Sequence, residues 1–390
     1  MRGNDVLQGT FVVDFDFTEE QRLLRDSVER LVADHYSFEK RRSHLAEPAG
    51  WSAEMWARYA ELGLLGLPFA EEHGGFGGGP IDVMLVMEAF GRALVLEPYL
   101  ATVVLAGTAL RLAGNAAQQA ALVPQIAAGT LRLAFAHGER QARYDLSDVL
   151  TTATPKAGGW LLDGAKSVVA HGDGADMLIV SARTAGERND RGGISLFLVD
   201  ANANGIARRA YAMRDGMRAA EIALSGVELG ADALLGEAGG GFAVVERVVE
   251  AGIAATAAEA VGAMEAMQAL TLEYLKTRQQ FGRPIGDNQA LQHRATEMFV
   301  ALEQGRSLAL LAAMMVEEPD AEERARNLAT VKVGVGQAAR FVSQNAVQLH
   351  GGIGMTEEYA VGHYFRRVMV IEHTFGDTAH HLSRLAREVA

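Results

Sequence analysis

The residues from Phe242 to Thr277 form an uninterrupted run that constrains the fold more than any other part of the sequence. The run contains no proline, and as a single α-helix it would extend for roughly 50 Å. Much of it is apolar on every face, so we expect this helix to lie inside a helix bundle or at a subunit interface. Acidic residues within the run exclude a membrane span: Glu246, Glu250, Glu259, Glu265 and Glu273.

Helical patterns continue to the end of the chain. A second long run starts at about Asn288, after a turn rich in glycine and proline. A third starts at Pro319–Asp320, where Glu323 stands at the spacing of a helix cap, and it ends at the glycine pair 351–352. The sequence therefore predicts a C-terminal four-helix bundle domain over residues 237–390.

Two other patterns precede this domain. Thr18 and Gln21 have the spacing of a capping box, and helical periodicity then predicts an all-α domain over residues 15–129. From Thr130 onward, short apolar runs alternate with Gly, Asp and Asn turns about every ten residues, which predicts an antiparallel β-domain over residues 130–236. Residues 1–14 fit neither pattern and are expected to be an extension. The predicted fold class is multidomain α+β.

Composition limits the function classes. The net charge of −13 argues against nucleic acid and acidic membrane surfaces as partners. The chain has no cysteine, which excludes disulfides, thiol nucleophiles and thiolate metal sites. Its 11 histidines show no metal-binding spacing, so no metal is expected. The first residues show no targeting pattern, and we expect a cytoplasmic protein.

The turn between the two long helical runs contains the most informative motif. Its sequence from residue 278 to 286 is Arg-Gln-Gln-Phe-Gly-Arg-Pro-Ile-Gly, followed by Asn288 and Gln289. Arg278 and Phe281 would stand at the tip of a helical hairpin, where a guanidinium and an aromatic ring are suited to an anionic, planar ligand such as a dinucleotide. An ordinary charged surface turn is the alternative interpretation.

The longer string resembles the signature turn of the acyl-CoA dehydrogenase family, which uses FAD. A second string, Gln-Leu-His-Gly-Gly-Ile-Gly from residue 348 to 354, resembles that family's other cofactor segment, although a glycine pair alone is also an ordinary helix end. The resemblance implies three domains in the order predicted above, and it implies that residues of both strings contact the FAD of a neighbouring subunit: Arg278, Phe281, Asn288, Gln289, Gln348, Gly351 and Gly352.

The chain departs from the family at the general base. Family enzymes remove the α-proton of an acyl-CoA thioester with a buried glutamate while a hydride leaves Cβ. Two ways of counting place Phe375 or Gly376 on that position, and the alternative family position falls on Gly252. Asp377 is a weak substitute, so the catalytic residue stays unidentified. The adjacent histidines, His380 and His381, are expected to be solvated at a helix start.

The β-domain also departs from the family pattern. The family's hydroxyl-rich flavin loop corresponds to Ala136-His-Gly-Glu139, and its Trp-x-Thr segment to Val168-Val-Ala170. Because the strings offered to a neighbour are retained, the resemblance implies a base-lacking small subunit of a hetero-oligomer, closest to the pimeloyl-CoA type. The implied partners are an acyl-CoA, a paralogous chain or a second copy, and an electron-transfer flavoprotein. There are two alternatives. The chain is a non-catalytic scaffold, or it is a flavin oxidase that uses Asp377 as its base.

Overall fold

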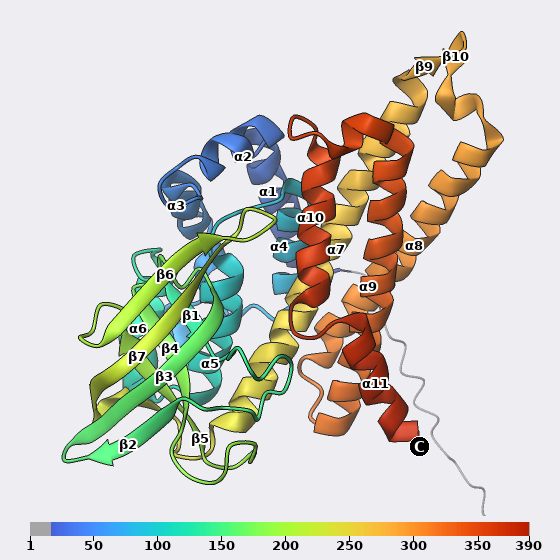
Figure 1. Cartoon of the computed structure of the whole chain (residues 1–390). Coiled ribbons are helices and arrows are strands. Elements are labelled where there is room, and N and C mark those ends of the chain that lie inside the picture. Colours follow the sequence, from blue (N-terminus) through green and yellow to red (C-terminus); the bar gives the residue numbers. More distant parts are fainter. Residues whose placement is uncertain (1–16, 390) are drawn as a thin grey trace, which may run out of the picture.

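The computed structural model describes residues 17–389, so the predicted extension, residues 1–14, lies outside the described residues. A helical domain, a β-domain and a helix bundle follow one another along the chain, which confirms the predicted fold class (Figure 1). The N-terminal domain contains the following elements: α1 (Glu19–His35), α2 (Phe38–Leu45), α3 (Ala53–Glu61), α4 (Pro80–Ala93), the π-helix η3 (Leu100–Ala106), α5 (Gly107–Ala113) and α6 (Ala116–Ala127).

The capping box predicted at the start of α1 is present. The Thr18 hydroxyl accepts a hydrogen bond from the Gln21 backbone N–H at 3.2 Å, and the Gln21 side chain accepts one from the Thr18 backbone N–H at 3.1 Å. Two of the backbone donors left free at the helix start are thereby satisfied.

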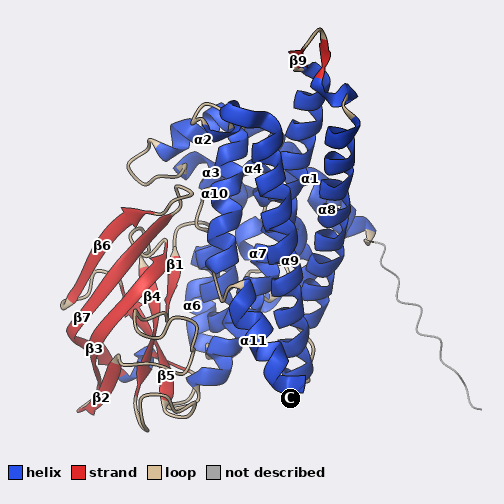
Figure 2. Ribbon diagram, turned by 45° about the vertical axis from the view of Figure 1, so that its right-hand side comes forward, coloured by secondary structure: helices blue, strands red, loops and turns tan. Residues whose placement is uncertain are grey.

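Within the described residues, the β-domain is one sheet of eight strands that packs beside the helices (Figure 2). An antiparallel sheet was predicted, and the prediction was wrong in part, because β1 lies parallel to β4. The chain enters the sheet along β1 and completes the β2–β3 hairpin before it returns beside β1. The strands are β1 (Leu133–Ala136), β2 (Thr152–Lys156), β3 (Gly159–Ala170), β4 (Met177–Arg183), β5 (Ile194–Asp200), β6 (Ile206–Ala212), β7 (Arg218–Gly230) and β8 (Leu234–Leu235).

The C-terminal domain is built around α7, which spans Gly241–Thr277 as predicted. Helices α8, α9 and α10 pack with α7 as a bundle, and α11 packs against α9. The remaining bounds are α8 (Gln289–Met315), α9 (Ala321–His350), α10 (Ala360–His373) and α11 (Thr378–Val389), with the short strands β9 (Gln279–Gln280) and β10 (Arg283–Pro284) between α7 and α8.

The apolar character of α7 on all sides has a structural reason. Val248 and Ala258 belong to the core of the N-terminal domain, while Val261 and Met264 belong to the core of the bundle. Where α7 crosses α4, a Cβ on Gly262 would lie 1.9 Å from the Glu88 carbonyl oxygen, so only glycine permits this close approach. The helix therefore serves as a shared wall between two domains.

A buried ionic cluster joins all three domains. The Arg367 guanidinium of α10 donates to both carboxylate oxygens of Glu259 on α7 at 2.6 Å, and to Asp215 of the β-domain at 2.7 Å. Arg41 of α2 donates to the Asp215 carbonyl at 2.9 Å and to the Leu94 carbonyl at 2.8 Å. Every one of these four charged side chains is at least nine-tenths buried. Burial by itself lowers the pKa of Arg367, but the two carboxylates outweigh that effect and raise it.

Candidate functional site

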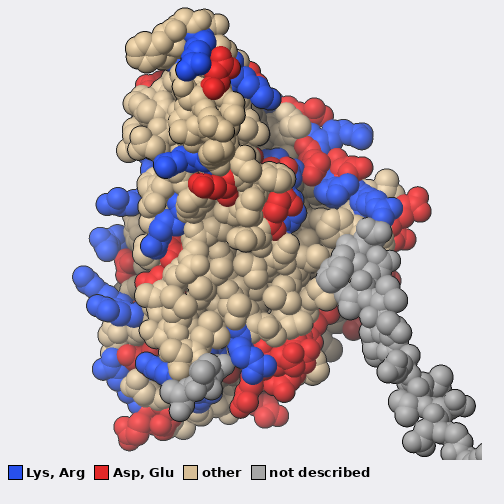
Figure 3. Space-filling view, turned by 90° about the vertical axis from the view of Figure 1, so that its right-hand side faces the viewer, with Lys and Arg blue, Asp and Glu red and all other residues tan. Residues whose placement is uncertain are grey.

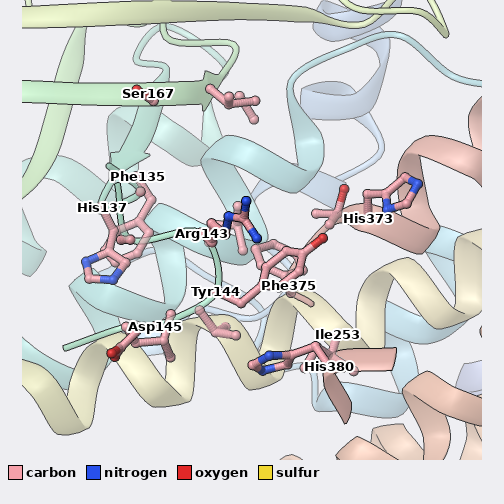
Figure 4. Close-up of a pocket in the computed structure, with 18 of the residues that line it drawn as sticks. Phe135, His137, Arg143, Tyr144, Asp145, Ser167, Ile253, His373, Phe375 and His380 are labelled. Atoms are coloured by element: carbon pink, nitrogen blue, oxygen red, sulfur yellow. The ribbon is translucent and has the colours of Figure 1, made fainter. Parts of the chain in front are cut away.

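A large cavity of about 1740 Å³ lies between the β-domain and the helix bundle (Figure 4). The β-domain contributes the loop after β1, including Arg143 and Tyr144, and the end of β3. Helix α7 contributes one face, with Glu246, Glu250 and Ile253, and the segments around α10 and α11 close the other side. A space of this size is suited to a ligand larger than a typical metabolite.

The cavity concentrates arginine in an otherwise acidic protein. Among the lining residues, Arg140, Arg143, Arg209 and Arg214 take no hydrogen bond or ion-pair partner from residues 17–389. Five acids line the same cavity, and two of them, Glu139 and Glu250, are bound to buried cations, which leaves Asp145, Glu221 and Glu246. The free positive charge of the wall therefore exceeds the free negative charge, which favours an anionic ligand such as a phosphate-bearing nucleotide.

Phe375 occupies the place where a general base was sought. Its backbone has φ = 61°, and a Cβ added to Gly252 would lie 2.6 Å from two atoms of the Phe375 ring. The Leu105 side chain lies 2.9 Å from the same point. The two alternative base positions that sequence comparison indicated thus meet in space, and one apolar ring fills the volume between them. Neither position carries an acid.

Asp377, the weak candidate for the base, caps a helix in the structure. Its carboxylate accepts a hydrogen bond from the His380 backbone N–H at 2.8 Å, as the cap of α11, and the residue does not line the cavity. His381 is not solvated as predicted: it is 3% exposed, and its Nε2 bonds to the Phe375 carbonyl at 3.0 Å. The cap and this buried histidine hold the turn that carries Phe375.

Glu250 is a wall residue that sequence reasoning set aside. Burial raises the pKa of its carboxyl, and the Arg324 guanidinium, which donates to it at 2.6 Å, opposes that shift. The Glu250 carboxylate is paired with Arg324, and this buried ion pair stabilises this part of the wall.

A buried ion pair holds the loop that follows β1. The Lys166 ammonium donates to Glu139 at 2.7 Å and to the Ser181 hydroxyl at 3.0 Å, and the ring of His137 bonds to the same hydroxyl at 2.9 Å. Burial lowers the pKa of Lys166 to about 8 although Glu139 opposes it. Burial also pushes the pKa of Glu139 upward, but the charge and hydrogen bonds of Lys166 outweigh this and bring it down to about 2. The ion pair between Glu139 and Lys166 therefore connects this loop to β3.

Val168 belongs to the segment Val168–Ala170, for which the resemblance led us to look for a Trp-x-Thr sequence. Val168 has φ = 53°, an unusual conformation for a β-branched residue, at a register shift between β3 and β7. Its side chain is 59% exposed and lines the cavity. An aliphatic side chain thus borders the cavity here, so this wall offers neither an aromatic ring nor a hydroxyl at that point.

The predicted hairpin tip projects from the end of the bundle (Figure 1). Phe281 is fully exposed and has φ = 54°, and Arg278 and Gln289 are exposed. The Asn288 side chain is used within the tip, since it accepts a hydrogen bond from Arg283 at 3.0 Å and donates to the Ile285 carbonyl at 2.9 Å. A fully exposed aromatic ring at the end of the bundle is suited to contact with another molecule.

The second string lies at the same end of the bundle as the tip. Gly351 has φ = 64°, and a Cβ on Gly351 or Gly352 would meet no atom within 4 Å, so both glycines border open space. Gln348 is also exposed. The structure therefore leaves the backbone of this turn accessible to a ligand from outside the chain.

Sequence reasoning missed the residue that connects the two strings. His350 is buried and its ring stacks on Tyr274 of α7, with ring centroids 4.6 Å apart. Its Nδ1–H donates to the Ala346 carbonyl at 2.8 Å, and its Nε2 accepts from the Tyr359 hydroxyl at 3.2 Å. Tyr274 precedes the tip and His350 precedes the glycine pair, so this stack fixes the positions of the two strings relative to each other.

Buried histidines predict an acid-sensitive fold. Burial lowers the pKa of His171 to about 4, with Asp173 and Asp215 opposing and Arg367 and Arg218 assisting, and it also lowers the pKa of His381 to about 4. These groups are neutral when folded but take up protons below pH 6.5 when unfolded, so stability falls as pH drops from about 6.5 to 4, by roughly 3 kcal/mol for each histidine.

Urea unfolding measured across this pH range checks the prediction. The uncharged variant His171→Asn is expected to show a shallower loss of stability between pH 6.5 and 4 than the wild type. Identical pH slopes for the two proteins would contradict the role given to His171.

Comparisons with known proteins agree with this architecture. The family models for the acyl-CoA dehydrogenase N-terminal, middle and C-terminal domains match residues 18–130, 134–227 and 239–390. The chain is 28% identical to the probable acyl-CoA dehydrogenase YngJ of Bacillus subtilis, over 96% of this chain and 98% of that protein.

Solved structures show the same likeness. Butyryl-CoA dehydrogenase from Megasphaera elsdenii matches with a TM-score of 0.88 and 26% identity, over 96% of this chain and 99% of that one. The ChsE4–ChsE5 complex from Mycobacterium tuberculosis contains a chain that matches with a TM-score of 0.86 and 26% identity, over 96% and 98% of the two chains.

The chain belongs to the acyl-CoA dehydrogenase family, a family of FAD-dependent flavoproteins. The family models match all three of its domains. The residues of the tip suit the pyrophosphate of FAD, whereas the residues around Phe375 do not suit proton removal from an acyl thioester.

Proposed function

We propose that the chain is the base-lacking small subunit of a hetero-oligomeric, FAD-dependent acyl-CoA dehydrogenase. The contact between Phe375 and Gly252 carries this proposal, because it fills both candidate base positions with one apolar ring. The exposed tip supports it, since a chain without its own base retains the residues suited to another chain's cofactor. The partner supplies the base and the contacts to the flavin ring.

In this role the chain binds and orients cofactor and does not move protons. Arg278 pairs with the pyrophosphate, Phe281 packs on the dinucleotide, and the open backbone at Gly351 and Gly352 approaches it without steric hindrance. Gln348, Asn288 and Gln289 frame the same site. When bound, FAD accepts the hydride that leaves Cβ of the acyl thioester.

An exposed apolar surface on the bundle supports association with a partner chain. In its most apolar stretch, α8 is only 39% buried. Figure 3 shows a broad face below the tip on which charged side chains are sparse. The bundle exposes the following large apolar side chains: Leu272, Phe299, Val300, Phe341, Ile353 and Met355. Apolar area of this kind is typical of an interface, and we infer a paralogous acyl-CoA dehydrogenase chain, with a second copy as the alternative occupant.

Other properties of the complex are predicted from the family resemblance. We expect an acyl-CoA substrate, of which a dicarboxylyl-CoA such as pimeloyl-CoA is one candidate, an electron-transfer flavoprotein as acceptor, and a cytoplasmic location. Turnover of adipyl-, pimeloyl- and octanoyl-CoA by the purified complex distinguishes dicarboxylyl from simple acyl chains.

Arg278→Ala tests the role of the tip. In the complex, this variant is expected to weaken FAD binding by about 1.5–3 kcal/mol, the contribution of a hydrogen bond to a charged group, and equilibrium dialysis of FAD measures the change. Lys276→Ala is a matched control, since Lys276 is an exposed cation of the preceding helical turn. Unchanged FAD affinity in Arg278→Ala would count against a cofactor role for the tip.

The alternatives predict different flavin content. A scaffold paralogue stabilises its partner without affecting FAD binding, so Arg278→Ala would leave a stable complex with full flavin occupancy. A flavin oxidase would hold FAD alone and consume oxygen. The capping role of Asp377 weighs against the oxidase, because that carboxylate is outside the cavity wall.

A further inference from the structure

A second, much smaller cleft lies between α4, the η3–α5 segment and α7. Its walls are apolar and include Val83, Val103, Val104, Ala251, Ala254 and Val316. Its volume is about 40 Å³, which at roughly 10–15 Å³ for each water-sized group accommodates about three such groups. The cleft therefore has room for a small functional group with a short apolar stem.

Arg111 is the charged residue on this wall, and its guanidinium has no partner. The Nε atom is buried and bonds to no described residue, and none of residues 17–389 forms a hydrogen bond or ion pair with the other guanidinium nitrogens. Burial lowers the pKa of Arg111, and the exposed Glu317 opposes that shift without reaching ion-pair distance. A buried Nε–H without a hydrogen bond is costly, and an anion bound at the guanidinium would satisfy it.

A second cation reinforces the positive charge. Arg247 of α7 donates to the carbonyl of Val316, a residue of the cleft wall, at 2.9 Å, and its charge further lowers the pKa of Arg111. Glu317 and Glu250 oppose these cations, but Glu250 is shared between Arg324 at 2.6 Å and Arg247 at 3.7 Å. The positive charge at the cleft thus exceeds the negative charge that is free to neutralise it.

The cleft is separate from the large cavity. Leu105 lines the cavity while the preceding Val104 lines the cleft, and Ala251 and Ile253 are divided in the same way on α7. Between them, Phe375 and Leu105 meet over Gly252. An apolar partition thus separates Arg111 from the space proposed for the larger ligand.

We propose that this cleft is a binding site for a small carboxylate, with the carboxylate on Arg111 and a stem of one or two carbons against the valine and alanine side chains. A planar carboxylate matches two N–H groups of a guanidinium and supplies the negative charge that the site lacks. The proposal does not depend on a partner chain, so the isolated full-length protein serves for its test.

Propionate titration followed by ligand-observed NMR is the test, with propionamide as the neutral analogue. Propionate is expected to bind saturably to the wild type, propionamide is not, and Arg111→Met is expected to weaken propionate at least about tenfold. Arg111→Lys retains part of the affinity. Val83→Phe, which fills the cleft from α4 and keeps the guanidinium, is expected to lose binding as well.

Equal propionate affinity in the wild type and in folded Arg111→Met overturns the proposal, as does a wild type that shows no saturable binding. Unchanged binding in Val83→Phe overturns the location. Binding of succinyl-CoA and of butyryl-CoA distinguishes the source of the carboxylate. If Arg111→Met weakens the binding of succinyl-CoA alone, the carboxylate arrives on an acyl chain. If it weakens the binding of neither, the ligand is a free acid.

Discussion

Replacing Arg367 by methionine is expected to lower the free energy of unfolding by about 3–5 kcal/mol. The substitution leaves the carboxylates of Glu259 and Asp215 buried without their shared cation. These two acids belong to different domains, so the loss is expected to weaken the junction of the β-domain with the bundle as well as the global fold. Urea unfolding at neutral pH measures the change.

Arg366→Met is the matched control for this prediction. The neighbouring Arg366 pairs with the exposed Glu357 at 2.6 Å, and surface pairs of this kind contribute at most about 1 kcal/mol. Similar losses of stability in both variants would show that the buried cluster contributes no more than a surface pair, contrary to the role described for Arg367.

The isolated chain is expected to oxidise acyl-CoA about 10²–10⁴-fold more slowly than its complex with a base-bearing partner, the factor that a positioned general base contributes. The physical reason is the Phe375 ring, which contacts the position of Gly252 and leaves no carboxylate there. With FAD and an artificial electron acceptor added to both preparations, the formation of enoyl-CoA measures the two rates.

Asp377→Asn completes this second prediction. Asparagine preserves the helix cap and removes the acid, so turnover by the complex is expected to stay within about twofold of the wild type. A loss of two orders of magnitude in this variant would instead identify Asp377 as the base and revive the oxidase interpretation.

Local signals in the sequence were sufficient for much of the fold. The absence of proline from Phe242 to Thr277 predicted α7 almost to the residue, and the capping box at Thr18 was confirmed atom by atom. Periodicity detected the strands but not their partners, so the parallel pairing of β1 with β4 was missed. Pairing depends on contacts distant in sequence, which a repeat of two residues does not encode.

The candidate site was predictable only in part for the same reason. Motif spacing identified the tip and the glycine turn, but the stack of Tyr274 on His350 that fixes them together joins residues far apart in the chain. Counting identified Phe375 and Gly252 separately, without their contact. His381 was expected in solvent but is buried, because a helix start leaves the direction of its side chains open until tertiary packing sets it.

The flavin content of the isolated chain and of its native complex tests most directly whether the tip serves a partner's cofactor. We predict a colourless isolated chain and a yellow complex with about one FAD for each pair of unlike chains. An isolated chain that binds one FAD per polypeptide and oxidises acyl-CoA unaided would contradict this assignment.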